Sequence, residues 1–185
     1  AALDGVNDLI SVSSGSHLNA PNSFTVEAWV YPTAFSSSYQ EIAARYQEYG
    51  TGTAIFDLGL TRDGIPFFEV MSGGYGTART VTASQAIALN QWTHIAGVFL
   101  SGTSLTVYVN GQAVANQTVS FESAQALSDV PFTIGRLPDV SSSQYPFKGY
   151  VDEVRYSASA RYQATFTPAA TFTSDSNTIL LFHFD

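Results

Sequence analysis

The sequence contains no cysteine among its 185 residues, so disulfide bonds, thiolate zinc sites and a cysteine nucleophile are excluded. Positive charge is also scarce: seven lysine and arginine residues stand against fifteen acidic ones, for a formal net charge of −8. Proteins that bind nucleic acid or anionic membranes need clustered positive charge. We therefore expect neither nucleic acid nor a membrane surface as a partner.

Long apolar runs are absent as well. No stretch approaches the roughly 18 apolar residues of a transmembrane helix, so we expect no membrane insertion. No signal peptide precedes the first expected strand, which predicts a mature fragment or an excised domain. The length fits one domain, residues 1–185.

The chain is rich in residues that form strands. Hydrophobic residues make up 45% of it and aromatic residues 14%, and most segments alternate apolar and polar side chains. Asn110-Gly111 between two such segments is typical of a tight hairpin. The predicted strands lie within residues 9–13, 24–31, 53–61, 65–70, 92–100, 105–114, 130–137, 149–157 and 177–185. These features predict an all-β fold, an antiparallel sandwich or barrel.

Two adjacent acids, Asp152 and Glu153, lie in one predicted strand. Neighbouring strand residues point to opposite faces, so the two carboxylates are not expected to flank one sugar as the acids of a retaining glycosidase do. Glu153 and Arg155 share a face and are expected to form an ion pair or a cross-strand network.

The other acids considered are scattered over different predicted strands and turns: Glu27, Glu41, Glu48, Asp57, Asp63 and Glu69. We therefore expect a protein that is not an enzyme. Three carboxylates converging in one groove would instead favour a hydrolase.

Aromatic residues beside glycine in predicted loops are candidates for sugar binding, because a sugar ring stacks on an exposed aromatic face while polar groups bind its hydroxyls. The alternative is that each tyrosine packs beneath its loop and holds it in place. Trp29 and Trp92 lie in predicted strands and are expected in the core. The candidate ligand-binding residues are Arg45, Tyr46, Tyr49, Tyr75 and Tyr145.

Several segments occur in an order that resembles a known family. They are ALDGVNDLISV, SFTVEAWVYP, QWTHIAGVF, LTVYVNGQAVA, PFTIGR and FKGYVDEVRYS, within residues 2–157. This order resembles the laminin-G-like domains of the concanavalin A-like lectin and glucanase class. The resemblance implies a jelly roll of two antiparallel sheets whose first and last strands lie close together. The glucanases of this class carry an E-x-D-x-x-E pattern, which is absent here.

The same resemblance implies a structural calcium ion. In related domains the aspartate of a strand like VDEVRY often binds Ca²⁺, which would make Asp152 a ligand and Asp4 its partner near the N-terminus. Oxygen ligands suit this hard cation. The alternative is that both aspartates cap turns and accept backbone N–H bonds.

Together these observations predict a non-catalytic carbohydrate-recognition module of a cell-surface or secreted protein. The alternative is a structural or adhesive protein-binding domain in a larger surface protein or a phage tail or virion, since the C-terminal residues 160–185 resemble tails of such domains. Both place the chain in an extracellular setting, at a cell surface or on a virion.

Overall fold

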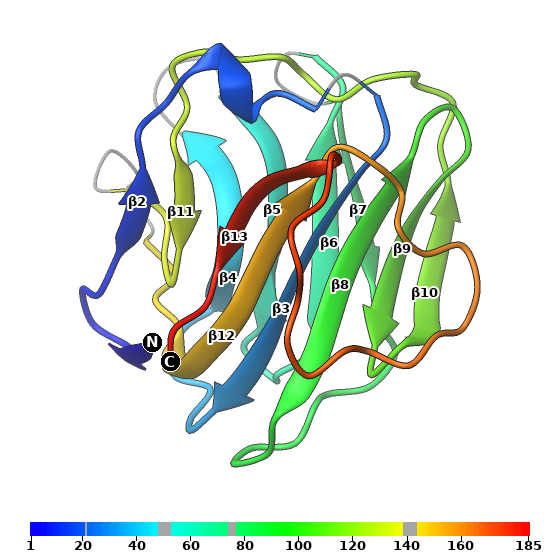
Figure 1. Ribbon diagram of the computed structural model, residues 1–185. Helices are drawn as coiled ribbons and strands as arrows, with labels where there is room; N and C mark the ends of the chain where they lie inside the picture. Colours follow the sequence, from blue (N-terminus) through cyan, green and yellow to red (C-terminus); the bar gives the residue numbers. More distant parts are fainter. Residues whose placement is uncertain (21, 48–52, 74–76, 139–143) are drawn as a thin grey trace.

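The computed structural model describes residues 1–20, 22–47, 53–73, 77–138 and 144–185 (Figure 1). Within these residues the strands form two antiparallel sheets. The seven-stranded sheet contains β1 (Ala2–Asp4), β12 (Lys148–Ser157), β3 (Phe24–Pro32), β8 (Thr93–Leu100), β9 (Ser104–Val109) and β10 (Gln112–Thr118) in this order, with β13 (Thr178–Phe182) beside β12. The six-stranded sheet has the order β2 (Ile10–Val12), β11 (Phe132–Ile134), β4 (Tyr39–Gln47), β5 (Thr53–Thr61), β6 (Pro66–Met71) and β7 (Ala78–Thr82).

This two-sheet sandwich confirms the predicted all-β fold. A short 3₁₀ helix, η1 (Ser16–Leu18), interrupts the described strands. No helix in the described residues is long and apolar enough to cross a membrane. β1 and β13 both pair with β12, so the two termini lie near the same sheet edge (Figure 1).

The core lies between the sheets and is built from the apolar side of each alternating strand. Aromatic rings from both sheets meet at its centre: Phe24 packs 5.4 Å from Phe56 and 6.0 Å from Phe68, measured between ring centroids. Gly97 on β8 faces Phe68, and a side chain there would collide with that ring. Burial raises the pKa of Tyr156, which packs among these rings, to about 12.

The predicted hairpin at Asn110-Gly111 joins β9 to β10. Both residues have positive φ, 49° and 78°, as the favoured two-residue turn requires. The dipeptide therefore specified this turn through its own backbone preferences.

The C-terminal segment, residues 158–185, covers the outer face of the seven-stranded sheet. It runs across β9 and β8 before its last strand joins β12 (Figure 1). Tyr162 and Phe166 stack at 3.5 Å between ring centroids and pack against Ala96, Val98 and Tyr108 of the sheet. This face is therefore closed over much of its width, whereas the segment does not cross the six-stranded sheet.

A polar cluster on β3, β8 and β12 binds the C-terminal segment to the sheet. The Glu27 carboxylate is fully buried and accepts hydrogen bonds from Arg155 Nε (2.8 Å) and the Tyr162 hydroxyl (2.8 Å), and His94 Nε2 lies 3.1 Å away. Burial alone would raise the pKa of Glu27, but the His94 hydrogen bond and the Arg155 charge lower it. Arg155 also lies 4.4 Å from the ring centre of Phe172 in the segment.

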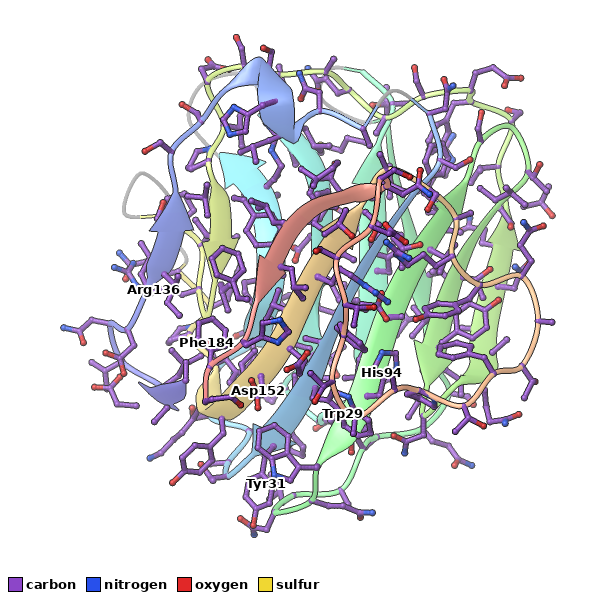
Figure 2. The ribbon with its side chains drawn as sticks, in the orientation of Figure 1. Trp29, Tyr31, His94, Arg136, Asp152 and Phe184 are labelled. Carbon is purple, nitrogen blue, oxygen red and sulfur yellow. The ribbon has the colours of Figure 1, made fainter. Side chains whose placement is uncertain are left out.

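A β-bulge between Asp152 and Arg155 changes the expected directions of the adjacent acids. Glu153 has a φ of 51°, which breaks the alternation of the strand. Both carboxylates consequently reach the C-terminal segment: Asp152 accepts a bond from the Phe184 N–H (3.0 Å), and Glu153 bonds to His183 Nδ1 (2.6 Å). Figure 2 shows Asp152 close to Phe184. Glu153 and Arg155 do not pair with each other, but the alternative of a cross-strand network is confirmed for Arg155, which bonds to Glu27 opposite it on β3.

The tryptophans also differ from the expectation of core residues. Trp92 is 44% exposed and lies 5.7 Å from Tyr31, whose ring is in turn 5.8 Å from the exposed Tyr150. Trp29 is half-buried, and its indole N–H donates to the Ala169 carbonyl of the C-terminal segment. Trp92 lies just before β8, at the end of the sheet, where no strand covers its ring.

The cluster around Glu27 generates a stability prediction. Glu27→Gln would leave the Arg155 charge buried without its carboxylate, which typically destabilises a protein by about 3–5 kcal/mol. We expect a loss of this order in the free energy of unfolding from urea denaturation at pH 7. The control is Glu122→Gln on the exposed surface, which should change it by less than about 0.5 kcal/mol. Equal stabilities of the two variants would contradict this account.

Candidate functional site

The outer face of the six-stranded sheet carries the candidate site. On β5, Leu58 and Leu60 enter the core, so Asp57 and Thr61 point to the other face. A cavity of about 270 Å³ opens there. It is lined by Tyr39, Glu41, Tyr46, Asp57, Thr61, Phe67, Glu69, Thr80, Thr82, Leu137 and Tyr145.

Three carboxylates form the polar part of this cavity, one from each of three neighbouring strands. Glu41 lies on β4, Asp57 on β5 and Glu69 on β6, and Asp57 is directly opposite Glu69 in the β5–β6 register. A bulge after Glu41 sets its position against β5. The three acids lie on different strands, as predicted, but strand pairing brings them together, which the sequence did not indicate.

Glu41 and Asp57 are deeply buried, at 1% and 8% exposure. Burial raises the pKa of Glu41 well above its usual range, and the Asp57 charge raises it further. Burial likewise raises the pKa of Asp57 to about 6. Within the described residues, no donor bonds to either Glu41 oxygen or to Asp57 Oδ1. A proton shared between the two carboxyl groups is therefore the hydrogen bond open to them.

The third carboxylate has a different environment. Glu69 is half-buried, and it accepts a hydrogen bond from the Thr80 hydroxyl on β7. Because Thr80 is the residue opposite Glu69 in the β6–β7 register, the sheet itself sets this contact.

Aromatic rings stand beside the carboxylates. Tyr39 is 44% exposed, and its ring centre lies 5.5 Å from Phe67 and 5.3 Å from Tyr145. The Tyr145 carbonyl accepts a bond from the Glu41 N–H (2.9 Å), which ties this aromatic residue to β4. Tyr145 has a φ of 47°, a conformation uncommon for a non-glycine residue. The cavity therefore combines an aromatic wall with an acidic floor.

Two of the candidate ligand-binding residues, Tyr46 and Tyr145, meet in this cavity. Tyr49 and Tyr75 lie outside the described residues. Arg45 belongs to β4 rather than to a loop, and its side chain is fully buried on the core side. Its guanidinium donates to the carbonyls of Leu18 (2.8 Å), Leu127 (2.8 Å) and Val130 (3.0 Å) and to Asn19 Oδ1 (2.8 Å). Arg45 thus joins connecting segments of the fold and presents no group to the cavity.

The residues considered for calcium do not form one site. Asp4 pairs in register with Lys148, four residues before Asp152 on β12, a separation of about 13 Å along the strand. Asp4 Oδ1 accepts the Val6 N–H (2.7 Å), and Asp152 Oδ1 accepts the Glu153 N–H (2.8 Å). No group of three or more metal-binding side chains occurs in the described part of the chain. The two aspartates therefore do not fit the metal as a pair.

Sequence reasoning missed Tyr39, Phe67 and the three acids. Phe67 and Glu69 had a signal, since both fall on the polar side of a predicted strand next to a strand carrying Asp57. β4 itself was not predicted, because Gln40, Glu41 and Arg45 give it no apolar alternation.

The family is identified by a sequence model described as the concanavalin A-like lectin/glucanases superfamily, which matches residues 4–165. No curated protein matches the chain.

Solved structures share the fold. A candidate carbohydrate-binding protein from Bacteroides ovatus superposes with a TM-score of 0.72 at 23% identity, over 98% of this chain and 50% of that one. The chain thus spans half the length of that protein. The CBM40 domain of the Ruminococcus gnavus IT-sialidase, also solved with α2,3-sialyllactose, superposes with a TM-score of 0.63 at 15% identity. This match covers 84% of this chain and 92% of that one. The enzymatically active domain of tailspike protein 2 from bacteriophage CBA120 superposes with a TM-score of 0.59 at 15% identity. This match covers 100% of this chain and 29% of that one.

The buried acid pair generates a pH prediction. In the folded state the pKa values of Glu41 and Asp57 exceed those of the unfolded chain, about 4.3 and 3.9. The pair therefore contributes stability that is complete below about pH 4 and is lost as pH rises through the raised pKa values, about 6 for Asp57 and well above its usual range for Glu41. Glu41→Gln removes one of these charges. We expect its melting temperature, relative to wild type, to rise by several degrees between pH 5 and pH 7.

The control is Asp63→Asn, which removes one exposed charge and keeps a turn dipeptide of the same kind. It should follow the wild-type pH profile. Parallel profiles for Glu41→Gln and wild type would show that the pair does not titrate in this way.

Proposed function

Because the chain belongs to the concanavalin A-like lectin/glucanase superfamily, we propose that it is a carbohydrate-binding module whose ligand occupies the cavity on the six-stranded sheet. The observation that carries this proposal is the exposed Tyr39 ring beside Glu41 and Asp57, whose buried oxygens Oε1, Oε2 and Oδ1 have no donor within the described residues. The candidate carbohydrate-binding protein and the CBM40 domain support it through their shared fold.

The chemistry of the cavity suits a sugar. An apolar sugar face stacks on a tyrosine ring, while hydroxyl groups donate to carboxylate oxygens. Tyr39 and Tyr145 offer the rings, and Glu41 and Asp57 offer buried carboxyl groups that no other described residue bonds through the Glu41 oxygens or Asp57 Oδ1. The volume of about 270 Å³ is just below the ligand-pocket range of about 300–1,000 Å³, which suits one sugar ring or a chain end.

Glycoside hydrolysis is the second candidate function, and the convergence of three carboxylates favours it. Two features favour binding without catalysis. Hydrolases place an acid and a second carboxylate on either side of the scissile bond. Here Glu41 and Asp57 are buried against each other, and all three acids come from adjacent strands of one sheet. We therefore propose a non-catalytic module.

We further infer that the module belongs to a larger protein that acts outside the cell or on a virion. The chain spans half of the Bacteroides protein and 29% of the tailspike chain, which supports a part within a longer assembly. An adhesive role toward protein would use a different surface. The candidate is a cluster at the end of the seven-stranded sheet, in which the exposed Trp92 and Tyr150 pack against the half-buried Tyr31.

A glycan array followed by titration calorimetry tests the function. Tyr39→Ala should weaken the affinity for the best glycan by about tenfold or more, because it removes the exposed stacking ring. Tyr150→Ala is the matched control, a tyrosine of similar exposure (48%) on the other sheet, and should bind as wild type. Bound oligosaccharide should stay intact after prolonged incubation, with no new reducing ends by chromatography.

Each result that differs from the expected one leads to a different conclusion. Absence of binding across the array contradicts carbohydrate recognition. Loss of binding in Tyr150→Ala but not in Tyr39→Ala moves the site to the other sheet. Release of reducing ends, abolished by Glu41→Gln, establishes hydrolysis.

The structural calcium ion stays a prediction. A ligand that binds only the folded state raises the melting temperature, so Ca²⁺ in excess over EDTA should raise it by several degrees. The comparison is made within each variant, since Asp152→Asn also alters the contact with Phe184. A calcium-dependent shift that survives in both Asp4→Asn and Asp152→Asn would exclude these two residues as ligands, and no shift in wild type would exclude the site.

A further inference from the structure

The acidic floor of the cavity points to the charge of its ligand. We propose that the cavity selects a sugar carrying a protonated amine, with the ammonium group on Glu41 and Asp57 and the ring against Tyr39 and Tyr145. This inference rests on the proposed function and names the ligand class within it.

The first observation is the missing counter-charge. Among the described residues, no lysine, arginine or histidine forms an ion pair with Glu41 or Asp57. Arg62 and Arg79, from nearby parts of the same sheet, donate instead to Ser38 Oγ and the Ala78 carbonyl. The pair is thus left without the cation that a buried carboxylate ordinarily has.

The chain itself contains the contrasting arrangement. Glu27 is buried to the same degree as Glu41, yet Arg155, His94 and Tyr162 all bond to its carboxylate. Glu41 has no donor on either oxygen. Glu27 therefore completes its interactions within the fold, whereas the described residues provide no donor for the buried Glu41 oxygens and Asp57 Oδ1 other than a proton shared between the two groups.

The number of acids is the second consideration. A site for neutral sugars needs hydrogen-bonding groups, which amide or hydroxyl side chains provide without burying charge. Here a third carboxylate, Glu69, stands opposite Asp57 and raises the negative potential further. A concentration of one charge in a partly buried cavity favours ligands of the opposite charge.

The aromatic wall serves the same ligand. Tyrosine and phenylalanine faces attract cations as well as the C–H groups of a sugar ring. Tyr39, Phe67 and Tyr145 form a connected set of rings beside the acids, so one aminosugar can contact both features at once. An ammonium group bound beside Glu41 and Asp57 would lower their raised pKa values. The proton between the two carboxyl groups would then dissociate.

Three β-1,4-linked tetrasaccharides provide a matched test, because they differ at carbon 2 alone: glucosamine carries an ammonium group, N-acetylglucosamine a neutral amide, and glucose a hydroxyl. Calorimetry at pH 7 and 0.15 M salt should show the glucosamine oligomer binding at least tenfold more tightly than the other two. Its affinity should fall at higher salt. Buffers of different ionisation heat should reveal that protons are exchanged when it binds, because its amine and the acid pair both titrate in this pH range.

Variants assign the effect to the acids. Glu41→Gln and Asp57→Asn should each weaken glucosamine binding at least tenfold and leave the weaker binding of the neutral oligomers within about twofold. Asp63→Asn should leave all three unchanged, since its exposed charge is screened at this ionic strength. Circular dichroism establishes that each variant is folded, and the two acid substitutions serve as independent tests.

The other outcomes separate this inference from the proposed function. If the neutral oligomers or other array glycans bind as well as the amine, and Glu41→Gln does not discriminate, the amine specificity is wrong and carbohydrate recognition stands. If no glycan binds but an oligolysine peptide does, the cavity recognises basic protein and both fail. If neither glycans nor oligolysine bind, both fail as well.

Discussion

The ion pair between Glu27 and Arg155 is the interaction on which the arrangement of this molecule depends. It lies on the outer face of the seven-stranded sheet, where Tyr162 and Phe172 of the C-terminal segment complete its surroundings. A buried carboxylate with this many partners is fully satisfied only while the segment covers it. The C-terminal segment therefore covers the outer face of the seven-stranded sheet through contacts that stabilise the fold. The candidate site lies on the other sheet.

Glu27 and the pair Glu41 and Asp57 are all buried, but they differ in whether the fold compensates for their burial. Glu27 has a lowered pKa because its partners compensate for its burial, whereas the pKa values of Glu41 and Asp57 are raised because nothing in the described chain does so. A protein under selection for stability alone gains nothing from such a pair. Buried polar groups without partners are expected at functional sites rather than in the rest of a fold, and these acids lie in a cavity beside the exposed Tyr39 ring.

The adjacent acids on β12 illustrate why residue type alone does not identify a site. Asp152 and Glu153 were the most conspicuous acids of the sequence, and both turned out to hold the C-terminal segment through Phe184 and His183. The less conspicuous Glu41, Asp57 and Glu69 lie 12 to 28 residues apart and share one cavity. Spacing along a chain predicts proximity within one strand, but only pairing determines proximity between strands.

The sequence by itself determined the strands with clear alternation, the Asn110-Gly111 turn and the superfamily, because each depends on local preferences or on the order of segments. The tertiary structure alone decided the rest. The order β4-β5-β6 brought the three acids together, and the bulge on β12 turned Glu153 toward His183. The burial of Arg45 depended on carbonyls up to 85 residues away. Such contacts between distant segments leave no periodic trace in the sequence, since they arise when sheets pair and pack.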